Sequence, residues 1–183
     1  MTTRATLRAD LRLRLEDTGA SPLWDDATLN AALAGAILRY GGIVPREATA
    51  TAVAAAGDRR LTPAAGTVDP ARITRVRDPA GAAVARWRDD DRPGDRAQGW
   101  RWREDGLDLA MPAAAGTWSI DYRAGRAAPG DDAAPAAVLP GDEGAVVALA
   151  VALALDRRAV EEAKRGGSGA AGAAGALRAL AAA

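Results

Sequence analysis

The sequence predicts an α+β protein. We expect a small helical bundle of two N-terminal helices plus one long C-terminal helix, with an inserted antiparallel β-meander or sandwich and a flexible C-terminal tail. Three observations predict this class. Leucines four residues apart mark a helix near the N-terminus, apolar residues alternate with a period of two from about residue 48 to 123, and a continuous apolar run fills 144–155. A chain of 183 residues is long enough to bury a sizeable core.

The N-terminus is expected to begin with a helix. Leu7, Leu11 and Leu15 recur every four residues, which places them on one apolar stripe. Thr2 or Thr3 can cap its start. Asp17 opens an Asp-Thr-Gly segment, where the glycine suits a left-handed C-cap that ends the helix.

A second helix follows, and its start carries the clearest signals. Asp25 is a suitable N-cap because its carboxylate can accept the free N–H groups of the first helical turn. Trp24 and Leu29 then occupy the N′ and N4 positions of a hydrophobic staple. The apolar pattern continues to Tyr40, and Pro45 prevents the helix from resuming after a pair of glycines.

The middle of the chain is expected to form antiparallel strands joined by tight turns. Asp-Pro-Ala-Gly at 78–81 suits a type I turn, and the Asp-Gly pair at 105–106 is a strong hairpin signal. In the last predicted strand Trp118 and Tyr122 fall on one face, alternating with polar residues. This pattern predicts a meander rather than a series of β-α-β units.

These signals divide the chain into five segments. They are 1–45, the first half of the helical part; 46–125, the inserted antiparallel β-region; 126–140, a connector; 141–165, the long apolar helix of the helical part; and 166–183, a Gly/Ala hinge with a C-terminal docking segment.

The composition excludes several classes of protein. The chain has no Cys and no His, so thiol chemistry, disulfides and Ser-His-Asp or Cys-His catalysis are impossible. Basic and acidic residues balance at 24 each, which argues against a general polyanion binder. A carboxylate hydrolase lacks any paired-carboxylate signature. We therefore expect no enzyme activity, no metal site and no cofactor.

Nothing in the sequence predicts a membrane protein. The N-terminus has no long apolar stretch of the kind found in signal peptides. The apolar run 144–155 is shorter than the roughly 20 residues that a bilayer-spanning helix needs. We expect this run to be a helix buried in protein, and the chain to be in the cytoplasm where it is made.

Two short motifs have an ordinary interpretation that we favour. Residues 167–172 match the letters Gly-x-Gly-x-x-Gly, but no strand precedes them and the chain ends before the required acidic residue, so a hinge is predicted. Three aspartates at 89–91 could hold Mg²⁺, yet consecutive side chains on an extended chain diverge. A solvated loop is the better interpretation.

Tryptophan and arginine alternate at 86–88 and 100–103, and this pattern has two interpretations. In a strand Trp100 and Trp102 share one face, which favours aromatic residues in the core and arginines in water or at an interface. Alternatively, the same residues form a stacking platform of a single-stranded nucleic-acid-binding module. Loss of oligonucleotide binding on Trp100→Ala would favour the second interpretation.

The joint order of these signals is more specific than any one of them. A leucine-rich helix closes on Asp-Thr at 17–18, and the later motifs are Trp-Asp-Asp-Ala-Thr-Leu at 24–29, Arg-Ile-Thr-Arg-Val at 72–76, Leu-Asp-Leu-Ala-Met-Pro at 107–112, Gly-Thr-Trp-Ser-Ile-Asp-Tyr at 116–122 and Leu-Pro at 139–140 before an Ala-rich helix. Over about residues 4–160 this order resembles that of the head-to-tail adaptor (connector) proteins of tailed bacteriophages. The residues that define the fold in this comparison are Leu11, Asp17, Trp24, Asp25, Leu29, Tyr40, Pro45, Trp118 and Tyr122.

The resemblance implies a structural virion protein without catalysis. Such adaptors form a homo-oligomeric ring, commonly of twelve copies, that joins the capsid portal to the tail at the head–tail junction. The ring lines a channel through which double-stranded DNA passes without sequence-specific binding. The implied partners are further copies of the chain, the portal protein and a tail, stopper or nozzle protein, with assembly in the host cytoplasm. In several adaptors the C-terminal segment docks on the portal, which here implies contacts through Leu177, Arg178 and Leu180.

Overall fold

Helices and strands both contribute to the structure, so the predicted α+β class is confirmed. The computed structural model describes residues 2–64, 68–87, 99–164, 172 and 175–179. Its elements are α1 (Arg4–Arg14), α2 (Asp26–Ile43), β1 (Arg46–Ala54), β2 (Arg60–Leu61), the 3-10 turn η1 (Pro70–Arg72), β3 (Ile73–Arg77), β4 (Ala83–Arg86), β5 (Gly99–Arg103), β6 (Gly106–Leu109), β7 (Gly116–Ala124) and α3 (Glu143–Lys164). Residues 175–179 are helical as well.

The chain divides into two compact units. The helical unit consists of Met1–Val44 and Gly125–Ala183, and the β unit consists of Pro45–Ala124. The helical unit is therefore built from two separate stretches of sequence, with the whole β unit between them in the chain.

The predicted caps fix where the first two helices begin. The side chain of Thr3 accepts a hydrogen bond from the backbone N–H of Thr6 at 3.3 Å and starts α1. Asp25 accepts from the N–H of Thr28 at 2.6 Å and starts α2. Each cap satisfies one of the N–H groups that a helix leaves without a partner in its first turn.

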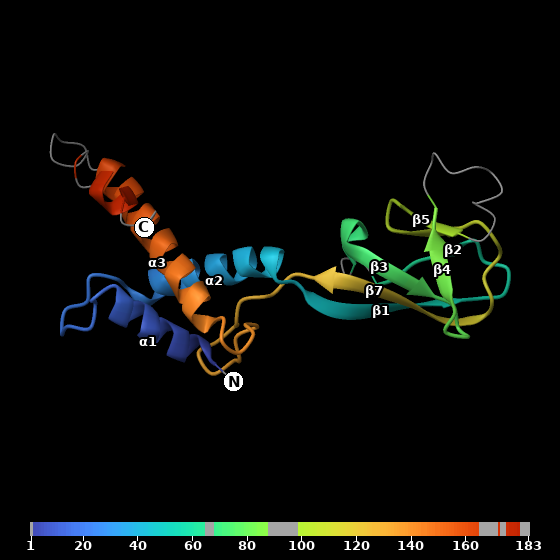
Figure 1. The fold of residues 1–183 in the computed structure, drawn as a ribbon, viewed down its shortest axis with the longest axis horizontal. Helices are drawn as coiled ribbons and strands as arrows, with labels where there is room; N and C mark the ends of the chain where they lie inside the picture. The colour runs from blue at the N-terminus through green and yellow to red at the C-terminus, as the bar shows by residue number, and fades with distance from the viewer. Residues whose placement is uncertain (1, 65–67, 88–98, 165–171, 173–174, 180–183) are drawn as a thin grey trace. The chain divides into compact units, whose positions relative to one another are not determined.

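The three long helices of the helical unit share one hydrophobic core (Figure 1). Its buried members are Leu7 and Leu11 of α1, Leu29, Ala32, Leu33, Ala36, Ile37 and Tyr40 of α2, Val146, Val147, Ala150 and Ala154 of α3, and Trp24. The predicted leucine stripe and the apolar run thus both face this core. None of the described helices is long and apolar enough to cross a membrane.

The β unit is one seven-stranded, mostly antiparallel sheet that is nearly barrel-shaped. The strand order is β1-β7-β3-β4-β5-β6-β2. β1 and β7 pair along their whole length, from Arg46 opposite Ala124 to Ala54 opposite Gly116. Trp118 and Ile120 of β7 are buried and Tyr122 packs against the same core, as the alternation predicts.

The strand order differs from the antiparallel meander expected from the sequence. β4 and β5 are parallel neighbours, with Ala85 opposite Gly99. Residues 87–98 link these strands, a length that suits the crossover connection that parallel neighbours need. β7 also inserts between β1 and β3, so strands distant in sequence become neighbours. Turn signals read along the chain describe local hairpins and carry no information about such pairings.

One of the two predicted turns lies where the sequence placed it, and the other is shifted. The turn at 78–81 joins β3 to β4, closed by a 3.0 Å hydrogen bond from the N–H of Gly81 to the carbonyl of Asp78. The hairpin between β5 and β6 turns on Glu104 and Asp105, because Gly106 already pairs with Arg103. This turn lies one residue earlier than expected. Glu104 adopts a left-handed conformation with φ of 57°, which glycine would adopt more easily.

Two adjacent glycines at the end of α2 have different surroundings. A Cβ atom on Gly41 would lie 2.6 Å from the backbone nitrogen of Arg126, where the returning chain crosses the helix. A Cβ atom on Gly42 would have no atom within 4 Å. Only the first glycine is required by the packing.

These two positions form a matched pair of substitutions. We expect Gly41→Ala to destabilise the helical unit by about 1–3 kcal/mol, because backbone must move to accept the methyl group. Gly42→Ala should stabilise it by about 0.5–1 kcal/mol, since alanine favours a helix over glycine. Urea unfolding followed by circular dichroism measures both. Equal effects of the two substitutions would contradict the proposed close approach.

Candidate functional site

The predicted site residues were located one by one in the ranges that the structure describes. In the ranges that the structure describes, no cluster of three or more acidic side chains is placed to hold a metal ion. The predicted site residues are instead parts of polar connections and cores within each unit.

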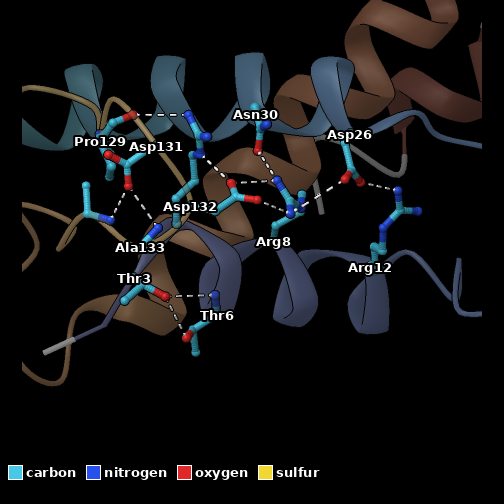
Figure 2. Close-up of polar contacts among 12 residues, drawn as sticks. Thr3, Thr6, Arg8, Arg12, Asp26, Asn30, Pro129, Asp131, Asp132 and Ala133 are labelled. Carbon is cyan, nitrogen blue, oxygen red and sulfur yellow. Dashed lines mark hydrogen bonds and ion pairs between the residues drawn. The ribbon is translucent and has the colours of Figure 1, made fainter.

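A row of arginines on α1 connects three parts of the helical unit (Figure 2). Arg8 donates to both carboxylate oxygens of Asp132, at 2.9 and 2.7 Å, and to the side-chain oxygen of Asn30 on α2 at 3.1 Å. Arg4 donates to the same Asp132 at 2.8 Å. Two guanidinium groups one helical turn apart thus share one carboxylate from the connector 126–140.

This arrangement perturbs the acidity of Asp132. Hydrogen bonds from Arg8 and then Arg4 lower the pKa of its carboxyl group from 3.8 to about 2. Bidentate contacts between guanidinium and carboxylate are directional as well as charged, so they fix the orientation of the connector on α1. No pattern in the sequence pairs these arginines with Asp132, because the partners lie 124 and 128 residues apart in the chain.

Asp17 organises the loop between α1 and α2. Its carboxylate is buried and accepts from the backbone N–H groups of Leu23 and Trp24, and from Arg12 on α1. Arg12 also donates to the carbonyl of Trp24 at 2.9 Å and to Asp26 at 2.7 Å. The buried charge is therefore paired and hydrogen-bonded, as burial of a carboxylate requires. Asp17 is more than a helix stop: it holds Trp24 at the core.

The end of α2 is joined to the returning chain through Tyr40. The Tyr40 hydroxyl donates to Asp142 at 2.6 Å, and the guanidinium of Arg126 lies 5.2 Å from the centre of the tyrosine ring. Arg126 is buried and donates to the carbonyls of Val44 at 2.6 Å and Ala137 at 3.0 Å. A cation at this position also suits the negative end of the helix dipole. Burial and, secondly, the hydrogen bond to Asp142 raise the pKa of Tyr40.

The remaining fold-defining residues lie apart from this network. Leu11 and Leu29 are core residues, and Pro45 begins the β unit directly after the C-cap of α2. The hydrogen bond from Thr28, chiefly from its N–H, lowers the pKa of Asp25. Trp118 and Tyr122 belong to the core of the β unit. The structure thus distributes these nine residues over two units rather than gathering them in one site.

Of the tryptophans in these strands, Trp100 belongs to the core of the β unit and Trp102 packs against it half-buried. Trp100 is only 2% exposed, and its indole N–H donates to the carbonyl of Val84 at 3.0 Å. The guanidinium of Arg86 lies 5.3 Å from the centre of its ring. Arg101 lies similarly over Trp87, at 5.2 Å. The ring of Trp100 is therefore covered by protein and that of Trp87 is half-buried, which weakens the case for base stacking.

A face of α2 turned away from the core is apolar. Ala27, Ala31 and Leu38 are exposed and Ala34 is half-buried, and these residues follow one another at helical spacing. Leu38 has 62% of its surface exposed. The helix is therefore apolar on nearly all sides, a pattern typical of helices that are buried in an assembly.

The C-terminal docking residues are only partly described. Leu177 is half-buried and Arg178 is exposed within the helical stretch 175–179. The Arg178 guanidinium lies 3.9 Å from the carboxylate of Asp156 on α3. Leu180, the aspartates at 89–91 and residues 167–171 of the glycine motif lie outside the described residues.

No protein-family model matches the chain, and a search of curated proteins finds no significant match.

The shifted acidity of Asp132 predicts a dependence of stability on pH. Because the carboxylate is favoured in the folded state, its contribution is full above pH 3.8 and is lost as the pH falls towards about 2. Thermal unfolding midpoints of the unmutated chain and of Asp132→Asn should differ at neutral pH and converge across this range. Asp10→Asn, which changes an exposed aspartate on α1, is the matched control and should show no such convergence. A constant difference down to pH 2 would contradict the assignment.

Proposed function

We propose that this protein is a structural virion protein of a tailed bacteriophage. It forms a homo-oligomeric ring at the head–tail junction, joins the portal to the tail and lines the channel for double-stranded DNA. The observation that carries this proposal is the order of cap, turn and strand motifs over about residues 4–160. In each subunit of the proposed ring, the helical unit is a bundle, the β unit is inserted into it, and the C-terminal segment is a flexible tail.

The exposed face of α2 supports self-association. A large apolar residue such as Leu38, exposed beside Ala27 and Ala31, costs solubility unless another protein covers it. Small side chains permit close approach of a neighbouring backbone. Head-to-tail contacts between identical subunits close into a ring when the rotation between neighbours divides a full turn. The proposed number of about twelve copies rests on the resemblance to adaptor proteins. The proposed contact face rests on the exposed apolar residues of α2.

A binding function for single-stranded nucleic acid is less well supported. It requires accessible aromatic faces, whereas Trp100 is buried under Arg86. Catalysis is likewise unsupported, because the chain lacks the His and Cys side chains that most general-base and nucleophilic mechanisms use. The role that remains needs only a stable scaffold with defined contact surfaces.

Native mass spectrometry of the full chain, alone and with the portal protein, tests the ring. We expect an assembly of about twelve copies in at least one of these samples. Ala31→Glu should reduce it to monomers, since it places a charge in the proposed contact, while Ala9→Glu on the exposed side of α1 should leave it intact. Monomers in both samples of the unmutated chain would overturn the proposal. An independent check is the genome, where portal and major capsid genes are expected just upstream.

The docking role of the C-terminal segment has its own test. A chain ending at Arg165 should bind the portal at least about tenfold more weakly than the full chain, because the proposed anchors are lost. In the full chain Leu177→Asp should weaken binding, whereas Ala179→Asp, an exposed neighbour, should not. Surface plasmon resonance on immobilised portal measures both. Unchanged binding by the shortened chain would exclude the segment as an anchor.

A further inference from the structure

The outer face of the sheet in the β unit is hollowed. Where β1, β7 and β3 run side by side, an open groove of about 600 Å³ lies on the side away from the core. Three arginines line it, Arg75 and Arg77 from β3 and Arg123 from β7. Its floor includes the short side chain of Thr49 on β1, opposite Asp121 of β7. Long side chains around a short one produce the hollow.

A β-bulge increases the number of polar groups in the groove. The register between β3 and β7 shifts between Ile73 and Arg75, so one extra residue, Thr74, enters β3. Thr74 and Arg75 are therefore both exposed, although they are consecutive. The Thr74 hydroxyl donates to the carbonyl of Asp121 at 3.1 Å. Bulges of this kind commonly redirect side chains next to binding sites.

The charges in the groove are unevenly compensated. Asp121 pairs with Arg77 at 2.9 Å and accepts from the hydroxyl of Thr49 at 2.9 Å, so this carboxylate is occupied. In the part of the chain that the structure describes, no carboxylate pairs with Arg75 or Arg123. Glu47 lies across from Arg123 in the register and reduces the net positive charge. Two guanidinium groups on one open face therefore keep free donors.

We propose that this groove binds a phosphate group. Arg75 and Arg123 donate to it, while Arg77 remains paired with Asp121. The guanidinium fork matches the oxygens of a phosphate and binds them more directionally than a lysine would. The phosphate can belong to a free anion or to the backbone of nucleic acid, and both share this chemistry. The proposal goes beyond the ring assembly and does not depend on it.

Calorimetric titration of the full chain with inorganic phosphate and with a short DNA duplex tests the site. The double variant Arg75→Ala/Arg123→Ala should lower the affinity for whichever probe binds by at least about tenfold. Arg103→Ala removes an exposed arginine from β5 and is the control for the loss of positive charge. It should change the affinity by less than about twofold. Glu47→Gln should strengthen binding by roughly twofold or more, because a repulsive carboxylate is removed.

Each outcome has one meaning. Saturable binding of phosphate alone identifies a small phosphate-bearing ligand, and tighter binding of the duplex, in competition with phosphate, identifies the nucleic-acid backbone. Absence of binding by both probes overturns the proposal. So does an equal loss on Arg103→Ala, which would indicate general electrostatic attraction, or a failure of Glu47→Gln to strengthen binding. The mass of the assembly plays no part in these readouts, so the ring and the groove can fail separately.

Discussion

The pairing of one carboxylate with two arginines ties the connector 126–140 of the helical unit to α1. Asp132 comes from a stretch of chain that follows the whole β unit, while Arg4 and Arg8 belong to the first helix. The backbone reinforces this contact, because the N–H of Ala5 donates to the carbonyl of Asp132 at 3.2 Å and the N–H of Ala136 donates to the carbonyl of Thr2 at 2.8 Å. Hydrogen bonds, the charge-assisted ones among them, therefore hold the connector against α1.

A second polar junction completes the unit at the other end of α2. Tyr40 donates to Asp142, just before α3 begins, and Arg126 donates to the carbonyls of Val44 at the end of α2 and of Ala137. One junction lies at the N-terminal half of α1 and the other at the C-terminus of α2. Together they position the connector 126–140 and the residues just before α3, which lie outside the helices that form most of the core.

Local features of this fold could be predicted from the sequence, and contacts between distant residues could not. The Asp25 cap, the Trp24 staple position and the alternation around Trp118 depend on neighbours within a few residues, so patterns along the chain describe them. The partner of Arg8 lies far along the chain, and many aspartates would have suited it equally. The same holds for the parallel pairing of β4 with β5. The bulge at Thr74 gave no signal, since its residue type is ordinary in a strand.

The close approach of Gly41 to Arg126 has a consequence for how the chain can be divided. It brings the point where the chain leaves the helical unit next to the point where it re-enters. The β unit likewise has its first and last strands paired, from Arg46 opposite Ala124. The two ends of each unit therefore lie close together. The entropic cost of bringing these distant ends together is offset by contacts inside the unit itself. Such an insertion behaves as an exchangeable module: one unit can be lengthened, shortened or replaced over evolutionary time while the other keeps its own core.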